Sequence, residues 1–176
     1  MRTGGRNGVT VALVAASVSF APLAAAHACS RNGKLSKLMP YAGQSALNGT
    51  TLDNDPAILA RLKRLPESVE AHLHRNLGVQ GYVDLVSCHL VLKGNAEHQG
   101  GIEDAIVDVN LYSGAVTAGL YSAGHTTIYL DQDPTAASSY DGSIPPAVRS
   151  WASNAASGFR LLEQLPSNAE IVKPGE

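Results

Sequence analysis

Two neighbouring residues, Cys88 and His89, have the side chains of a thiolate nucleophile and its base. Such catalysis needs a ring nitrogen within hydrogen-bond distance of the sulfur. The residues around them predict an extended strand, and adjacent strand residues point to opposite faces of a sheet. The two side chains therefore cannot easily meet. We expect Cys88 to form a disulfide, and we assign no catalytic residue.

A second group of residues that could take part in chemistry consists of three carboxylates, Glu103, Asp104 and Asp108. Asp104 and Asp108 share one strand face, and at ~3.3 Å per residue they are about 13 Å apart, beyond the carboxylate spacing of glycosidases. We therefore expect a solvated strand face. A hydrolase or metal-dependent enzyme that uses this face with His98 or His125 is the alternative. No spacing typical of metal ligands occurs, so we expect no metal and no cofactor.

The first 28 residues have the pattern of a signal peptide. Arg2 and Arg6 charge the leading end, residues 9–20 are apolar, and the stretch ends in Ala26-His27-Ala28. This A-x-A form is typical of a cleavage site. The apolar run is too short to span a bilayer comfortably. We expect export to the periplasm or the medium, and a single domain over residues 29–176.

The chain has two cysteines, Cys29 and Cys88. In an oxidising compartment they are expected to form a disulfide, which would tie the start of the mature chain to the first strand. Cys29 directly follows the expected cleavage point, so lipid attachment through its thiol is the alternative.

The charge of the chain argues against one class of partner. The full sequence has 13 basic and 15 acidic residues, and removal of Arg2 and Arg6 leaves 11 against 15. A nucleic-acid partner would call for a basic surface, so we expect a protein partner and no nucleic acid.

Alternating apolar residues predict four consecutive antiparallel strands. In the second strand, Ile106 alone interrupts the alternation. One sheet face is then apolar and must be covered. The expected strands are Tyr82–Leu92, Ile102–Tyr112, Ala115–Ser122 and Thr126–Asp131.

Three helices are expected around this meander. Asp55-Pro56 provides an N-cap and a first helical proline, and Pro66 starts a second helix that ends at Gly78. His72 and His74 on this helix point to different sides, which favours surface histidines over a metal pair. The last helix runs from Ala147 to about Leu165. The fold class is α+β, a four-stranded antiparallel meander with helices packed on one face.

Residues 94–101 form the longest loop between the predicted strands, and glycines bound it. Long polar loops on rigid hairpins often carry binding determinants. A connection without a role is the alternative. We select Glu97 and His98 in this loop, and His125 on a neighbouring hairpin, as candidate partner-binding residues.

Four features follow one another from Leu65-Pro66 to Leu130: a Leu-Pro that opens a helix, a strand that ends in Ser87-Cys88, a polar loop with a histidine, and a hairpin with Gly119-Leu120. This order resembles the inhibitor of vertebrate lysozyme family, whose members are small periplasmic proteins. The resemblance implies a sheet packed with helices and an exposed loop that enters the active-site cleft of a lysozyme. The family's loop has the form C-K-P-H-D-C. Matched from Cys88, this chain lacks the second cysteine and the His-Asp pair.

We therefore expect an exported, non-enzymatic protein that inhibits, or gives immunity against, a cell-wall-degrading enzyme such as a lysozyme. The hydrolase described above is one alternative. The other is an envelope module that docks a partner through its sheet.

Overall fold

The computed structural model describes the larger part of the chain: residue 29 and residues 33–131, 144–157, 165, 167 and 169–173. The predicted signal peptide and residues 158–164 of the predicted last helix lie outside these residues. Among the residues described, no helix combines the length and the apolar character that crossing a membrane requires.

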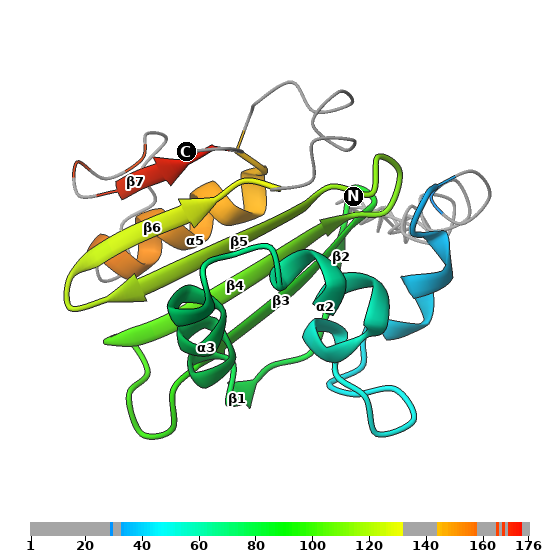
Figure 1. The fold of residues 1–176 in the computed structure, drawn as a ribbon, viewed down its shortest axis with the longest axis horizontal. Helices are drawn as coiled ribbons and strands as arrows, with labels where there is room; N and C mark the ends of the chain where they lie inside the picture. Colours follow the sequence, from blue (N-terminus) through cyan, green and yellow to red (C-terminus); the bar gives the residue numbers. More distant parts are fainter. Residues whose placement is uncertain are drawn as a thin grey trace, which may run out of the picture.

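A seven-stranded sheet forms the centre of the molecule (Figure 1). The strand order is β1-β3-β4-β5-β6-β7, and β2 also pairs with β3. All neighbours are antiparallel except β6 and β7. The strands are β1 (Val79–Gln80), β2 (Asp84–Val86), β3 (His89–Asn95), β4 (Glu103–Asn110), β5 (Val116–Ser122), β6 (His125–Tyr129) and β7 (Ala169–Val172).

The predicted α+β class is correct, but the four-stranded meander is too small. The predicted first strand is divided by a tight turn at Ser87 and Cys88, whose φ angles are 48° and 66°. Two successive positive φ angles reverse the chain and match the twist of a hairpin. Neither residue is Gly, Asn or Asp, the residues that favour positive φ in a two-residue hairpin turn, so the alternation of side chains concealed the break. The parallel strand β7 was not predicted.

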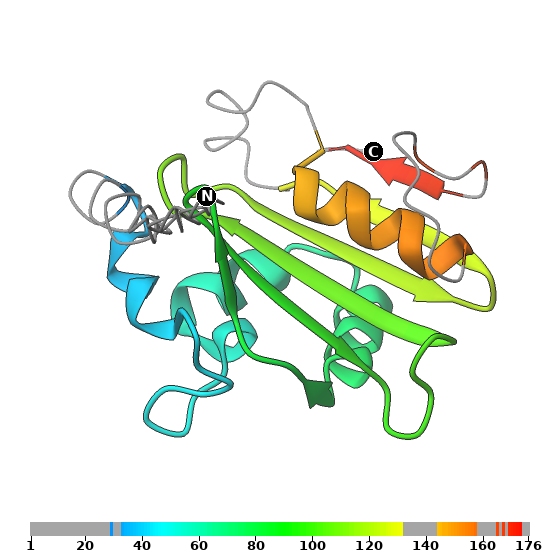
Figure 2. The ribbon, with the colours of Figure 1, turned by 180° about the vertical axis from the view of Figure 1, so that it is seen from behind.

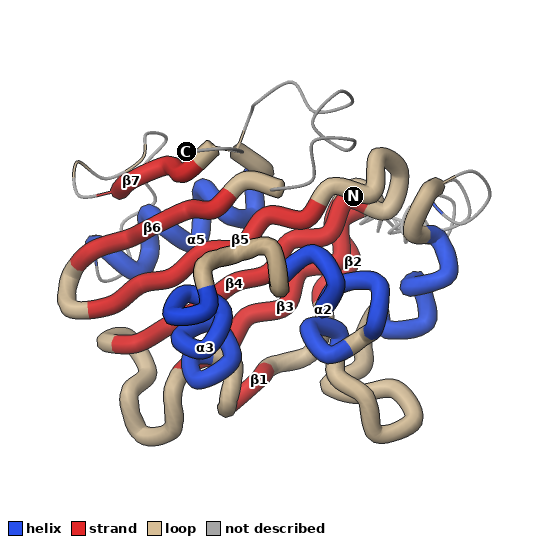
Figure 3. The backbone as a smooth tube through the Cα atoms, in the orientation of Figure 1, coloured by secondary structure: helices blue, strands red, loops and turns tan. Residues whose placement is uncertain are grey.

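Helices cover both faces of the sheet. α2 (Pro56–Leu62) and α3 (Glu67–Asn76) lie on one face, and α5 (Pro146–Ser157) lies on the other, as Figures 1, 2 and 3 show. The Asp55 side chain accepts a hydrogen bond from the Ala57 amide at 2.9 Å, which confirms the predicted N-cap. Two short 3₁₀ helices, η1 (Ser36–Tyr41) and η2 (Leu52–Asn54), precede α2.

Each face has its own hydrophobic core. The larger core joins α2 and α3 to the inward residues of β3, β4 and β5, including Val107 and Val109. The smaller core joins Val148 and Trp151 of α5 to Ile106 and Ile128. The expectation that all helices cover one face is therefore wrong. Ile106 shows the physical reason, because the residue that breaks the alternation packs under the opposite helix layer.

A disulfide joins Cys29 and Cys88, whose Cα atoms are 5.3 Å apart. The predicted pairing is thus confirmed. The sulfur of Cys29 in this bond cannot carry a lipid. Cys88 lies in the turn between β2 and β3, so the disulfide reaches the sheet at the start of β3. There the Leu111 amide donates a hydrogen bond to the Cys88 carbonyl at 2.9 Å.

The smaller core predicts a sharp effect of a single added methyl group. A Cβ at Gly119 would lie 2.6 Å from a ring carbon of Trp151 and 2.8 Å from Cγ2 of Ile106. We expect Gly119→Ala to lower the free energy of unfolding by roughly 1–3 kcal/mol through overpacking. Urea unfolding measures this change.

The matched control is Gly81→Ala, because Gly81 is exposed and its added Cβ would meet its nearest atom at 3.8 Å. We expect this variant to unfold within about 0.5 kcal/mol of the unchanged protein. Equal stability of the two variants would contradict the proximity of α5 and β5.

Candidate functional site

The candidate site is the loop that joins β3 to β4, residues 96–102, here called the site loop. It extends beyond the sheet in Figure 1. The predicted loop began at residue 94, but Gly94 and Asn95 belong to β3, where they pair with Ala105 and Asp104. The strands therefore support the loop up to its first residue.

Backbone hydrogen bonds order the site loop. The Ala96 amide donates to the Glu103 carbonyl at 2.9 Å, and the Gln99 amide donates to the Ala96 carbonyl at 2.9 Å. The Glu103 amide in turn donates to the Gln99 carbonyl at 3.0 Å. Gly101 has a φ of 80°, and its amide donates to the Asp104 carboxylate at 2.9 Å. The loop is thus a compact series of turns.

Glu97 and His98 are the central residues of the turn that the hydrogen bond between Gln99 and Ala96 closes, and we call them the tip of the site loop. Their side chains are 80% and 91% exposed, and Nε2 of His98 lies 3.4 Å from Oε1 of Glu97. His98 has a φ of 59°, an uncommon conformation for a residue other than glycine. Ile102, near the end of the loop, is a large apolar residue that is 60% exposed. The loop therefore offers a carboxylate, an imidazole and an apolar side chain to solvent.

The structure places His125 at the same end of the sheet but apart from the tip. His125 is exposed and begins β6, opposite Ser122 of β5. Three interstrand spacings of ~4.8 Å separate β3 from β6, about 14 Å in all. His125 therefore does not join Glu97 and His98 in one cluster.

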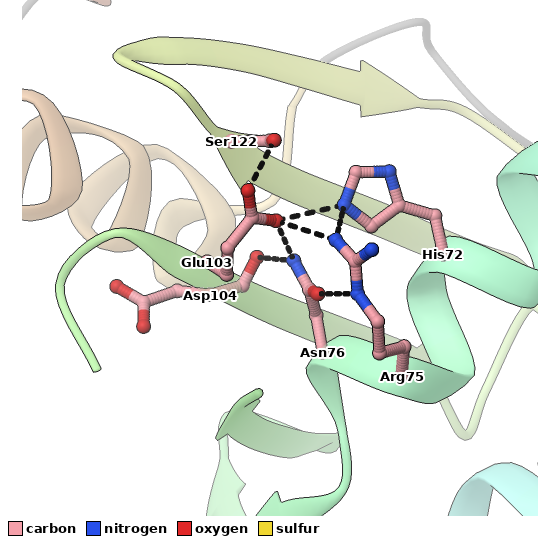
Figure 4. A network of polar contacts seen from close by, with 6 residues as sticks. All are labelled: His72, Arg75, Asn76, Glu103, Asp104 and Ser122. Carbon is pink, nitrogen blue, oxygen red and sulfur yellow. Dashed lines mark hydrogen bonds and ion pairs between the residues drawn. The ribbon is translucent and has the colours of Figure 1, made fainter. Parts of the chain in front are cut away.

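A polar network surrounds the carboxylate of Glu103, the first residue after the site loop (Figure 4). Oε2 accepts hydrogen bonds from Arg75 Nη2 at 2.9 Å and from Asn76 Nδ2 at 3.1 Å, and it lies 2.8 Å from His72 Nε2. Oε1 accepts from Ser122 Oγ at 2.7 Å. Asn76 also donates to the Asp104 carbonyl at 3.3 Å. We call Glu103 and its four side-chain partners the Glu103 network.

The hydrogen bonds favour the ionised form of Glu103. Burial of the carboxyl opposes ionisation, but hydrogen bonds from His72, Ser122 and Asn76 outweigh it and lower the pKa from 4.5 to about 2. His72 Nε2 also lies 2.6 Å from Arg75 Nη2. A nitrogen cannot both donate to Glu103 and accept from Arg75. The negative carboxylate favours a proton on Nε2, directed at Glu103.

The three acidic residues of β4 do not gather in one site. Glu103 contacts α3 on one face of the sheet, whereas Asp104 and Asp108 lie on the other face, as their alternation requires. The expectation that Asp108 is solvated is wrong, because it is 1% exposed and its Oδ1 lies 2.5 Å from His89 Nδ1. Burial raises the pKa of Asp108, and the contact with His89 acts in the opposite direction.

Sequence reasoning missed the residues of α3 that contact Glu103. His72, Arg75 and Asn76 are three and four residues apart, so they share one side of the helix. That spacing was the available signal. His74 points elsewhere, as predicted, and its Nδ1 lies 3.3 Å from the buried Asp53 carboxylate. In the part of the chain that the structure describes, no three His, Cys, Asp or Glu side chains form a group that could hold a metal.

The lowered pKa of Glu103 predicts how stability depends on pH. Its value in the fold, about 2, is below the ordinary 4.5, so the ionised carboxylate stabilises the fold above pH 4.5 and this contribution is lost as pH falls toward 2. The shift corresponds to up to about 3 kcal/mol. We expect the difference in the free energy of unfolding between the unchanged protein and Glu103→Gln to shrink over this range.

Urea unfolding of both proteins at several pH values between 6 and 2 measures that difference directly. Other carboxylates titrate in both proteins, so their contribution cancels in the comparison. A difference that stays constant across the range would contradict the assignment.

Comparison with known proteins gives one match. A model of the family described as "Inhibitor of vertebrate lysozyme (Ivy)" matches residues 57–158, which is more than half of the chain and includes the site loop and the Glu103 network. No curated protein and no solved structure matches the chain.

Proposed function

The chain belongs to the inhibitor of vertebrate lysozyme family, and from this membership we propose that it inhibits a lysozyme by inserting the tip of its site loop into the active-site cleft. One observation carries the assignment to this loop. Glu97 and His98 are the exposed tip of a loop whose two ends are fixed by hydrogen bonds to the sheet.

The chemistry of the tip suits the cleft of a glycoside hydrolase. Such enzymes place two carboxyl groups on either side of the scissile bond, one of them protonated. The imidazole of His98 can donate a hydrogen bond to one carboxyl group or accept one from the other. Glu97 would pair with a basic or hydrogen-bonding group at the wall of the cleft. A tip bound in this way would exclude the sugar chain.

The position of His98 in the loop supports this proposal. In the family's C-K-P-H-D-C loop, the histidine is the third residue after the first cysteine. Matched from His98, the two cysteine positions are occupied by Asn95 and Gly100. Cys88 is not the counterpart of either, because it lies at the other end of β3 and is bonded to Cys29. On this match, His98 takes the place of the loop histidine, and the chain has no cysteine bracket around it.

We also propose that the protein is exported. The leading segment has the pattern of a signal peptide. The disulfide between Cys29 and Cys88 suits an oxidising compartment such as the periplasm, where cell-wall-degrading enzymes act.

Alanine substitutions at the tip test the proposal. We expect Glu97→Ala and His98→Ala each to weaken lysozyme inhibition by roughly tenfold, which corresponds to about 1.4 kcal/mol of binding free energy. The melting temperature should not change, because both side chains are largely exposed. His125→Ala should have a smaller effect, since His125 lies away from the tip. Titration of lysozyme activity against a cell-wall substrate measures the inhibition constants.

Tyr112→Ala is the control, because Tyr112 is 67% exposed and lies in the turn between β4 and β5, at the end of the sheet opposite the site loop. It should inhibit like the unchanged protein. Unaltered inhibition by both tip variants, or their unfolding, would remove the assignment to the site loop.

A further inference from the structure

We propose that Glu103 is a positioning residue for the site loop: its carboxylate fixes the loop in the conformation that binds the partner before the partner arrives. The inference rests on the proposed function for its consequence, the affinity for a lysozyme. Its structural part, the ordering of the loop by the Glu103 network, stands on contacts within this chain.

Glu103 is linked to the site loop both through the backbone and through hydrogen bonds. It directly follows Ile102, and its own amide and carbonyl groups bond to Gln99 and Ala96. Any displacement of Glu103 therefore moves the hydrogen bonds that close the loop from both sides. The side chain is held by partners from two other elements, α3 and β5 (Figure 4).

Two of the four side-chain partners of the carboxylate, Asn76 and Ser122, are themselves held by the fold, whereas Arg75 is 58% exposed. Asn76 is fully buried, and its neighbours Leu73 and Leu77 belong to the larger core. Ser122 ends β5 and pairs with Glu103 in the register of the sheet. Donors from a packed helix and a neighbouring strand thus meet at one carboxylate, whose two oxygens are each engaged. Such charge-assisted bonds are stronger than those between neutral groups.

Glu103 acts through the loop and does not itself meet the partner. Its side chain is 14% exposed, whereas those of Glu97 and His98 are 80% and 91% exposed. A loop that is ordered in the free protein loses less conformational freedom on binding, and this increases affinity without any new contact. Glu103 therefore sets how strongly the exposed tip binds.

The first experiment uses Glu103→Gln, which keeps the size of the side chain and removes its charge. Amide hydrogen exchange of residues 96–102, measured by NMR without any enzyme, should become at least several-fold faster. Exchange in the centres of β4 and β5 should rise only as far as the loss of global stability, measured by urea unfolding, requires. The inhibition constant should rise by about tenfold. Asp84→Asn is the matched control, because Asp84 also bonds to a basic residue, Lys93, but lies on β2, away from the loop.

A second experiment separates positioning from direct contact. A Cβ at Gly100 would lie 3.6 Å from Cγ of Asn95, and Gly100 does not have a positive φ. Cysteines at these two positions are therefore expected to form a disulfide across the loop. We expect the oxidised E103Q/N95C/G100C variant to recover inhibition to within about threefold of the unchanged protein. The E103Q/N95S/G100S variant, which cannot form the bond, should remain weak.

Two results would overturn the inference. One is unchanged exchange of the site loop in Glu103→Gln. The other is weak inhibition by the triple variant when mass spectrometry shows that the new disulfide has formed. If the unchanged protein binds no lysozyme but Glu103→Gln still loosens the loop, the proposed function fails and the positioning of the loop by Glu103 stands.

Discussion

The structure depends on one strand that is buried on both faces. Residues 105–109 of β4 are all buried, and alternate members of this run enter different cores. A shift of the register by a single residue would exchange the two sets, so that each would meet the core packed for the other and the carboxylate of Asp108 would enter the larger core. Packing of β4 between α2 and α3 on one face and α5 on the other therefore fixes the register of the sheet, and with it the residue at which the site loop ends.

The fixed register of β4 affects the site through the position of Glu103. Because the register of β4 is fixed, Glu103 stays opposite Ser122 and next to α3, where its carboxylate accepts hydrogen bonds. A partly buried carboxylate is costly unless its oxygens have partners. Here both oxygens of the Glu103 carboxylate accept hydrogen bonds. The carboxylate therefore stabilises the fold and holds the end of the site loop in place. A disulfide bracket could hold such a loop covalently, whereas this chain uses charge and hydrogen bonding.

Local patterns in the sequence predicted most of the helices and strands but few of the contacts between them. The N-cap at Asp55, the strands from residue 102 onward and the pairing of Cys29 with Cys88 follow from local chemistry and from the number of cysteines. The turn at Ser87 and Cys88 does not, because its two positive φ angles are imposed by the surrounding sheet. The parallel strand β7 pairs with β6 across a wide separation in sequence, and alternation within one segment cannot reveal such a partner.

The residues of the candidate site, too, were predictable from the sequence only in part. The exposure of Glu97 and His98 could be predicted because a polar loop is recognisable from its composition. The Glu103 network was missed because its members come from α3, β4 and β5 and meet only in the folded chain. Asp108 was expected to be solvated since alternation predicts one wet face, and the second helix layer removed that face. Ile106 was the local sign that both faces are covered.

The position of the Cys29–Cys88 bridge determines how the molecule would be oriented on a surface. Cys88 lies just before β3 and the site loop just after it, so the seven residues of this strand, at ~3.3 Å each, place the two about 23 Å apart. Any polypeptide, bead or membrane attachment that precedes Cys29 is therefore tethered at the pole opposite the tip. The tip of an immobilised molecule would face away from its support, free to meet an enzyme that diffuses toward it.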